Sequence, residues 1–207
     1  MKLVAISQRV DVIPLYNERR DAIDQKWINF LTSCGFVPIL IPNSLLATKT
    51  ILGQFNWNGI LLTGGNDLLN YGGDAPERDQ VEELLIKYSI ENEISLFGVC
   101  RGMQMIQNFF GVKLERLNGH VGREHKILFN NKPRLVNSYH NFGAKNTVPE
   151  LEVIAKSDDG VVEAICHKKY KIQGIMWHPE RYKEFQEFDL RLVKELFDSS
   201  ILNKVVN

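Results

Sequence analysis

Four short apolar runs in the first half of the chain alternate with segments of helical spacing, and this alternation constrains the fold more than any other feature. The runs cover residues 3–6, 37–41, 60–62 and 96–99. None shows the polar alternation of a half-exposed strand, which is typical of a parallel sheet that is covered on both faces. The order strand, helix, strand, helix therefore predicts an α/β fold with a doubly wound, mostly parallel sheet.

The second half of the chain has a different pattern. In the first half, apolar residues recur at helical spacing over residues 23–34 and 81–88. After Leu117, short strands follow one another with few helices between them. These strands are expected at residues 127–129, 135–136, 151–155, 161–166 and 172–176. The turn sequence Asp158-Asp159-Gly160 predicts a hairpin between two of them. We expect an antiparallel extension of the sheet and a last helix over residues 185–196.

Length and charge narrow the class of protein. A chain of 207 residues can bury one sizeable core, so we expect a single domain over residues 1–207. The 25 basic and 25 acidic residues argue against a general nucleic-acid binder, which carries a basic excess. No apolar run is long enough for a signal-peptide core or a membrane span. We expect a soluble, cytoplasmic protein with a small-molecule partner and neither a nucleic-acid polymer nor a membrane as partner; a homo-oligomer is compatible with this picture.

One of the three cysteines stands in a distinctive context. Cys34 and Cys166 lie on apolar stripes and are expected in the core. Cys100 instead joins the apolar run 96–99 to a helical segment, within Gly98-Val99-Cys100-Arg101-Gly102. This is the nucleophile-elbow pattern with cysteine in place of serine. Small neighbours permit the strained turn, and the helix N-terminus favours the thiolate. The pattern predicts that Cys100 is a nucleophile.

Two further motifs follow predicted strands and complete a candidate catalytic set. His178 comes directly after the strand near residue 176, in Trp177-His178-Pro179-Glu180, where Glu180 can orient its imidazole. Thr63-Gly64-Gly65-Asn66-Asp67 follows the run 60–62, and the N–H groups of Gly65 and Arg101 would form an oxyanion hole. Each motif alone also fits an ordinary turn, and its pairing with the elbow favours the catalytic interpretation.

Together with Val136-Asn137-Ser138-Tyr139-His140, these motifs resemble the class I glutamine amidotransferase-like superfamily and, within it, the γ-glutamyl-γ-aminobutyrate hydrolase branch, peptidase family C26. The resemblance runs from the first strand to Glu180. It implies a flavodoxin-like sheet and a triad of Cys100, His178 and Glu180. It also implies substrate contacts, in which Gln104 and the Ser138-Tyr139 backbone hold the α-amino and α-carboxylate groups of a glutamyl moiety. Asn66 and His140 are further candidate contacts, and Phe142 stands where the branch commonly has glutamine.

The polar loop expected after the first strand is a candidate site for the leaving group. Arginine suits oxyanions, and four arginines are candidate contacts for a phosphate: Arg9, Arg19, Arg20 and Arg78. Internal Glu/Arg pairing on a solvated segment is the alternative. The sequences Ser-Gln-Arg-Val-Asp and Asn-Glu-Arg-Arg-Asp also resemble the enzymes of capsule phosphoramidate synthesis. That resemblance implies hydrolysis of γ-glutamyl-CDP-amidate to glutamate and cytidine diphosphoramidate.

The expected function is cysteine-dependent hydrolysis of a γ-glutamyl amide bond, with no metal and no organic cofactor. His120, His125, His140 and His167 have no compact ligand spacing along the chain, so no zinc site is expected. Three alternatives stay open. They are a hydrolase for γ-glutamyl-γ-aminobutyrate or another small γ-glutamyl amine, a glutaminase subunit that delivers ammonia to a synthetase partner, and a non-enzymatic binding or regulatory relative.

Overall fold

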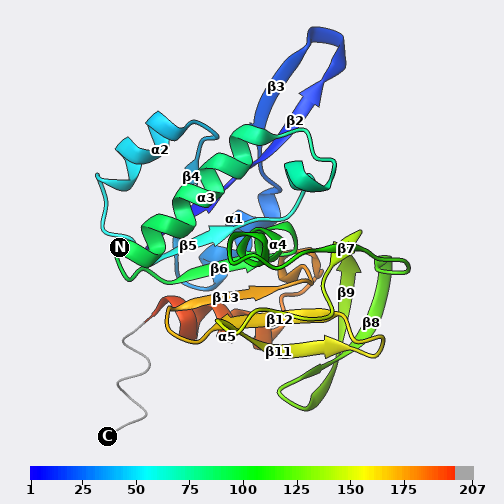
Figure 1. Ribbon diagram of the computed structural model, residues 1–207. Coiled ribbons are helices and arrows are strands. Elements are labelled where there is room, and N and C mark those ends of the chain that lie inside the picture. Colours follow the sequence, from blue (N-terminus) through cyan, green and yellow to red (C-terminus); the bar gives the residue numbers. More distant parts are fainter. Residues whose placement is uncertain (199–207) are drawn as a thin grey trace, which may run out of the picture.

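A nine-stranded sheet with the order β4-β1-β5-β6-β13-β12-β11-β8-β9 forms the centre of the computed structural model, which describes residues 1–198 (Figure 1). Its first five strands are parallel. They are β4 (Val37–Ile41), β1 (Leu3–Ser7), β5 (Gly59–Leu62), β6 (Leu96–Val99) and β13 (Ile172–Ile175). In chain order these strands read 2-1-3-4-5, which is the flavodoxin-like arrangement. The predicted doubly wound α/β fold is confirmed.

The other four strands extend the sheet in antiparallel fashion, as predicted. They are β12 (Val162–His167), β11 (Leu151–Ser157), β8 (Val121–Phe129) and β9 (Lys132–Tyr139). The turn Asp158-Asp159-Gly160 joins β11 to β12, and Gly160 has a φ of +83°, a conformation that favours glycine. A separate pair, β7 (Glu115–Arg116) and β10 (Phe142–Gly143), lies beside this extension.

Helices cover both faces of the parallel strands (Figure 1). On one face lie α1 (Gln25–Ser33) and α5 (Glu187–Phe197), and on the other α2 (Leu45–Leu52), α3 (Pro76–Glu91) and α4 (Arg101–Phe109). Alternate residues of β5 enter opposite cores: Leu61 packs with α1 and α5, whereas Ile60 and Leu62 pack with the other three helices. Because both faces are buried, the strand sequence is continuously apolar. No helix within residues 1–198 is both long and apolar enough to cross a membrane.

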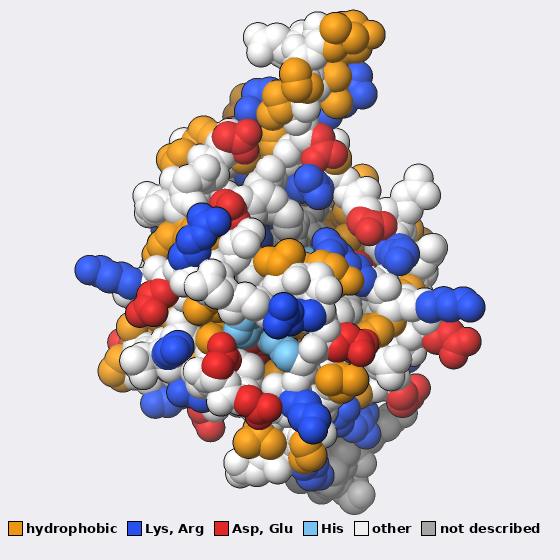
Figure 2. All heavy atoms as spheres, turned by 90° about the vertical axis from the view of Figure 1, so that its right-hand side faces the viewer, with side chains coloured by type: hydrophobic (Ala, Val, Ile, Leu, Met, Phe, Trp, Pro, Cys, Tyr) orange, Lys and Arg blue, Asp and Glu red, His pale blue; other side chains and the backbone are white. Residues whose placement is uncertain are grey.

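The polar segment after β1 differs from the expected loop. It forms a hairpin of β2 (Arg9–Ile13) and β3 (Glu18–Ala22) around the short 3-10 helix η1 (Pro14–Tyr16), and it projects from the body of the protein (Figure 1). Leu15 and Tyr16 at its tip are 81% and 68% exposed, and Figure 2 shows hydrophobic side chains gathered there. Strand β3 is exposed along nearly its whole length, so its sequence Glu-Arg-Arg-Asp-Ala lacks the apolar alternation by which strands are recognised.

Candidate active site

Cys100 sits in a strained turn between β6 and α4. Its φ is +53° and its ψ is −106°, which a residue with a side chain rarely adopts. The flanking glycines are needed for close packing: a Cβ on Gly102 would lie 2.2 Å from the carbonyl oxygen of Leu62, and one on Gly98 would lie 2.6 Å from the carbonyl carbon of Gly102. The turn presents Cys100 at the carboxyl ends of the parallel strands, where doubly wound sheets bind their ligands.

His178 lies between Cys100 and Glu180. It precedes the 3-10 helix η3 (Pro179–Arg181), and its Nδ1 lies 2.6 Å from Glu180 Oε1 in a region where both residues are 2% exposed. The Cys100 side chain acts on the same imidazole and raises its pKa. Burial lowers the pKa of His178, but Cys100 and Glu180 raise it more strongly, and the net effect brings it to about 9. The imidazole is therefore positively charged at neutral pH.

Asn137, at the end of β9, holds the backbone of His178. Its Oδ1 accepts from His178 N at 2.8 Å, and its Nδ2 donates to the His178 carbonyl oxygen at 2.9 Å. The ring of Tyr139 stands edge-on to the imidazole, with 5.6 Å between the ring centroids. Asn137 was not among the residues predicted for the site. The motif over residues 136–140 contains Asn137 and could have indicated it. The sequence pattern does not show that its amide bonds to a backbone 41 residues away.

The glycine loop after β5 packs directly against His178. A Cβ on Gly64 would lie 2.6 Å from His178 Cε1, so a larger residue would displace the imidazole. Gly65 follows with a φ of +85°, in the left-handed region that favours glycine. Arg101 is the first residue of α4, immediately after Cys100. The loop and the start of α4 thus flank His178 and Cys100, and the oxyanion role of the Gly65 and Arg101 N–H groups stays a prediction.

Arg78 differs from the expected phosphate contact. Its side chain is completely buried, and its Nη2 donates to the carbonyl oxygens of Thr63 at 2.7 Å and Gly64 at 3.0 Å. It also donates to the Gly65 carbonyl oxygen and, at 2.9 Å, to Glu82 Oε1. The Arg78 guanidinium is engaged by the loop backbone and the Glu82 carboxylate, with no exposed face left for a substrate. Arg78 therefore positions the glycine loop.

A second buried arginine continues this network. The Arg101 side chain, 1% exposed, forms ion pairs with Glu82 and Asp79. Ser7 at the end of β1 donates to Glu82 Oε1 at 2.8 Å. Two arginines and two carboxylates thus hold the glycine loop against α3 and α4. Breaking one partner of such a network is costly because an uncompensated charge stays buried.

A pocket opens beside His178, between the glycine loop, the base of the hairpin and α1. Its lining includes positively charged, negatively charged and aromatic side chains: Arg9, Asp11, Asp24, Trp27 and Arg181. Arg9 Nε lies 2.7 Å from Asp11 Oδ1. Arg181 was not predicted. Its guanidinium lies over the Tyr139 ring, 4.2 Å from the centroid, and its Nε lies 3.7 Å from Glu180 Oε1. Its position next to Glu180 in the sequence was the signal for it.

The remaining leaving-group candidates are placed differently. Arg19 and Arg20 lie on the exposed strand β3, where Arg19 Nε donates to Glu77 Oε1 at 2.8 Å and Arg20 Nε donates to Glu18 Oε1 at 2.9 Å. These pairs correspond to the solvated alternative considered from the sequence. The pocket lining includes Arg9 but neither of these two arginines within the described residues 1–198.

Asn66 and the predicted glutamyl contacts are engaged in internal hydrogen bonds. Asn66 pairs with the backbone of Val10 through both amide atoms, each at 2.9 Å, and so ties the glycine loop to the hairpin. Gln104 Nε2 donates to the carbonyl oxygen of Phe142 at 2.9 Å, and His140 Nδ1 lies 3.0 Å from the same oxygen. These contacts orient the side chains, and their contact with a glutamyl group stays a prediction.

Ser138 and Tyr139, the other two predicted glutamyl contacts, end β9. The Ser138 hydroxyl is buried and donates to the His120 carbonyl oxygen at 2.6 Å. Tyr139 is 41% exposed and stands between His178 and Arg181. Ser138 therefore joins β9 to the segment before β8, while the Tyr139 ring borders the candidate site.

Three histidines with no compact spacing along the chain meet in three dimensions. Ligand atoms of His120, His125 and Glu163 all lie within 4.8 Å of one another, and His140 Nε2 lies 3.6 Å from Glu163 Oε1. Of the four histidines outside the predicted triad, His167 lies apart from the other three. It packs against Tyr170, with 4.6 Å between the ring centroids. Strand pairing brings the scattered histidines together, so their linear spacing does not exclude a metal site.

Comparisons with known proteins agree with this architecture. The model of the family "Glutamine amidotransferase class-I" matches residues 19–195. The chain is 29% identical over 201 residues to a gamma-glutamyl-CDP-amidate hydrolase of Campylobacter jejuni, covering 94% of this chain and 96% of the relative. It is also 29% identical over 199 residues to a gamma-glutamyl-gamma-aminobutyrate hydrolase of Escherichia coli O157:H7, covering 76% and 78%. A crystal structure of a putative GMP synthase subunit from Thermoplasma acidophilum superposes with a TM-score of 0.70 at 16% identity, covering 95% of this chain and 93% of that one, which shows a shared fold.

Proposed function

The chain belongs to the class-I glutamine amidotransferase family, and on that premise we propose that it hydrolyses γ-glutamyl amide bonds with Cys100 as the nucleophile. The observation that carries the proposal is the buried series of contacts from Cys100 through His178 to Glu180, with 2.6 Å between His178 Nδ1 and Glu180 Oε1. The relatives named as γ-glutamyl hydrolases support the same reaction.

In the first step the Cys100 thiolate attacks the γ-carbonyl carbon of the glutamyl group. The N–H groups of Gly65 and Arg101 stabilise the negative charge that develops on the carbonyl oxygen. The His178 imidazolium then gives its proton to the leaving nitrogen as the C–N bond breaks. A γ-glutamyl thioester on Cys100 and a free amine or amidate are the products of this step.

In the second step water replaces the amine. His178, now neutral, takes a proton from the water while the water oxygen attacks the thioester carbonyl carbon. The C–S bond breaks, glutamate leaves, and the proton on His178 restores the starting pair with the Cys100 thiolate. Glu180 keeps the imidazole in one orientation through both steps, since it accepts from Nδ1.

For the leaving group we propose a nucleoside diphosphate amidate, with γ-glutamyl-CDP-amidate as the substrate and cytidine diphosphoramidate as the product used in capsular polysaccharide modification. Arg9 and Arg181 both line the pocket next to His178. Guanidinium groups bind diphosphate oxygens through paired hydrogen bonds, so these two arginines are the proposed contacts. In the complex, diphosphate oxygens take the place of Asp11 as the partner of Arg9. The Campylobacter jejuni relative, which aligns over 94% of this chain, supports this choice.

The test compares kcat/KM for γ-glutamyl-CDP-amidate, γ-glutamyl-γ-aminobutyrate and γ-glutamyl-methylamide, with Cys100→Ala as the inactive reference. We expect the nucleotide substrate to be preferred at least about tenfold, which corresponds to roughly 1.4 kcal/mol. Arg9→Ala and Arg181→Ala should raise KM for the nucleotide and leave the methylamide unaffected, whereas the exposed Arg20→Ala should change neither. Preference for a short amine would overturn the nucleotide assignment, and full turnover by Cys100→Ala would overturn the nucleophile.

A further inference from the structure

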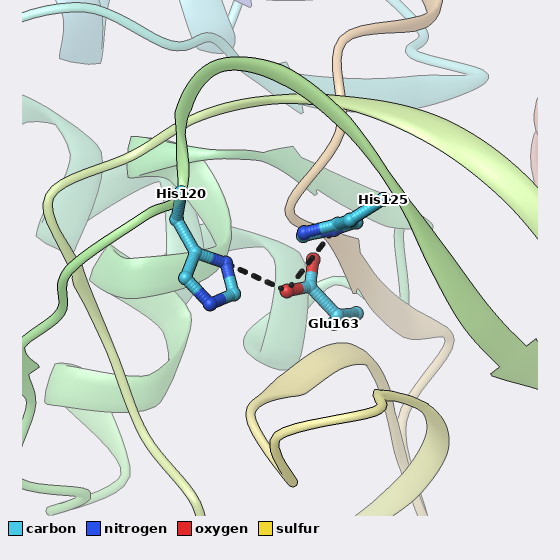
Figure 3. Close-up of side chains that lie close together, drawn as sticks. All are labelled: His120, His125 and Glu163. Atoms are coloured by element: carbon cyan, nitrogen blue, oxygen red, sulfur yellow. Dashed lines mark ion pairs between the residues drawn. The ribbon is translucent and has the colours of Figure 1, made fainter.

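We propose that a second, buried site in this protein binds a divalent transition-metal ion of the zinc class. The site is the histidine cluster, defined as His120, His125, His140 and Glu163. His120 precedes β8, His125 lies on β8, His140 follows β9 and Glu163 lies on β12. Figure 3 shows the His120 and His125 rings turned toward the Glu163 carboxylate. In Figure 2 histidine side chains reach the surface near the centre of the face, between acidic and basic side chains.

Four polar atoms of the cluster converge. Glu163 Oε1 lies 3.4 Å from His120 Nδ1, 3.4 Å from His125 Nε2 and 3.6 Å from His140 Nε2. His120 is 4%, His140 2% and Glu163 1% exposed. Within residues 1–198 none of these four atoms has a partner with hydrogen-bond geometry. Buried polar atoms almost always have a partner, so three unpartnered ring nitrogens around one unpartnered carboxylate oxygen point to a shared ligand.

The outer contacts of two histidines determine which nitrogen carries the hydrogen. His120 Nε2 lies 2.9 Å from Asp159 Oδ2, and His140 Nδ1 lies 3.0 Å from the Phe142 carbonyl oxygen. Both acceptors require an N–H, so in the neutral form of each ring the lone pair of His120 Nδ1 or of His140 Nε2 faces the Glu163 carboxylate. Lone pairs and a carboxylate repel one another unless a positive charge lies between them.

The ligand atoms of His120, His125 and Glu163 all lie within 4.8 Å of one another, close enough to share one metal ion as that charge. Zinc binds imidazole nitrogen and carboxylate oxygen at about 2.0–2.2 Å in a tetrahedron, which places neighbouring ligand atoms roughly 3.3–3.5 Å apart. The observed separations from Glu163 Oε1 are 3.4, 3.4 and 3.6 Å. Direct N–H···O hydrogen bonds would be about 2.7–3.2 Å long.

The surroundings have the form of a metal centre. A metal-binding histidine commonly donates its other N–H to a carboxylate or a backbone carbonyl. Asp159 and the Phe142 carbonyl take these roles, and Ser157 Oγ donates to Asp159 Oδ1 at 2.6 Å. Three histidines and one carboxylate suit zinc or a similar borderline ion better than magnesium or calcium, which prefer oxygen ligands.

The cluster is structural, because it ties together segments that support the candidate active site. The Ser138 hydroxyl and the His140 N–H both donate to the His120 carbonyl oxygen, at 2.6 and 3.1 Å. Met176 N, two residues before His178, donates to the Glu163 carbonyl oxygen at 2.8 Å. A bound ion would therefore link β12 to the segments at the ends of β8 and β9 and stabilise the fold around His178.

The test measures metal content and geometry in the full chain without an affinity tag. We expect wild-type protein to retain about one zinc ion per chain after dialysis, and cobalt to give the visible absorption bands of a tetrahedral site. Glu163→Gln and His125→Asn should each lose the bound ion and the cobalt bands. The matched control is His167→Asn, which removes a histidine outside the cluster and should bind as the wild type does.

Two measurements keep the result interpretable if a buried substitution harms folding. Circular dichroism identifies variants that are folded, and His125→Asn is the conservative choice because its side chain is 15% exposed. Chelation of the wild-type protein should lower its Tm by several degrees, and zinc should restore it. Wild-type protein that binds neither zinc nor cobalt, or folded variants that bind them as well as the wild type, would overturn the proposal in favour of histidines charged by protons.

Discussion

The Asn137 side chain forms two hydrogen bonds with the backbone of His178. It accepts from the N–H at 2.8 Å and donates to the carbonyl oxygen at 2.9 Å. Because the two residues come from β9 and from the segment after β13, the imidazole position depends on an amide from the antiparallel extension of the sheet. The extension thus contributes to the geometry of the proposed catalytic residues as well as to the core.

Asn137→Ala should lower kcat by about tenfold to a hundredfold, since a displacement of about 1 Å in a proton-transfer group has effects of this size. KM should change much less, because Arg9 and Arg181, the proposed contacts of the leaving group, are unchanged. Steady-state kinetics with the best γ-glutamyl substrate measure both constants. The matched control is Asn92→Ala at the exposed end of α3, which should behave as wild type. Unchanged kcat in a folded Asn137→Ala would show that His178 needs no such support.

His178 should titrate near pH 9, well above the ordinary imidazole value of 6.5. Burial lowers this pKa, but Cys100 and Glu180 raise it further, so the charged form is favoured in the folded protein. The sign follows: the contribution of this group to stability is fully present below pH 6.5 and is lost as the pH rises through about 9. Activity that needs the imidazolium should decline over the same alkaline range.

NMR of the His178 ring protons tests this assignment. In Cys100→Ala the pKa of His178 should fall, because the contribution of Cys100 is removed while burial still opposes the charge. The ring resonances of His167 provide an internal reference far from Cys100. Identical titration of His178 in both proteins would contradict the coupling.

Gly64→Ala should remove activity while the fold is kept. The new Cβ would lie 2.6 Å from His178 Cε1, a contact that the imidazole can relieve only by moving. We expect kcat/KM to fall by about a hundredfold or more and Tm to change little. Gly53→Ala at the end of α2 is the matched control, because its Cβ would have no atom nearer than 3.7 Å. Wild-type activity in Gly64→Ala would mean that the ring tolerates displacement.

Asp189 on α5 should make stability depend on pH. Burial raises its pKa to about 6 from 3.8, although Trp177 Nε1 donates to its Oδ1 at 3.0 Å and opposes the shift. The folded state therefore holds a proton more tightly than the unfolded state, and stability falls as the pH rises from about 4 to 6. At neutral pH the charged form costs at most about 2–3 kcal/mol.

Asp189→Asn should consequently raise Tm at pH 7 by several degrees and have little effect near pH 4. The asparagine still offers an oxygen to the Trp177 indole, so packing is conserved. Thermal unfolding at the two pH values measures the difference. Glu187→Gln, on the exposed side of the same helical turn, should leave Tm unchanged at both. A stabilisation of Asp189→Asn that is equal at pH 4 and pH 7 would rule out titration as its cause.

The parallel part of the fold and the elbow could be predicted from local pattern. The run 60–62 is continuously apolar because helices bury β5 on both sides. Consecutive residues of the sequence therefore show that the strand is buried. The small residues around Cys100 and the spacing from His178 to Glu180 are equally local. In contrast, the β2–β3 hairpin buries little beyond Val10 and its strand β3 is almost wholly polar, so the segment was not distinguished from a loop.

The sequence by itself determined the chain order of the five parallel strands, the strained turn at Cys100 and the short link between His178 and Glu180, because each depends on neighbours along the chain. Only the tertiary structure decided that Arg78 turns inward to hold the glycine loop, that Asn137 reaches His178, and that His120, His125 and His140 meet at Glu163. These contacts depend on where β8, β9 and β12 lie in the sheet and on how the helices pack. Contacts between residues far apart in the chain produce no periodic pattern in the sequence from which they could be predicted.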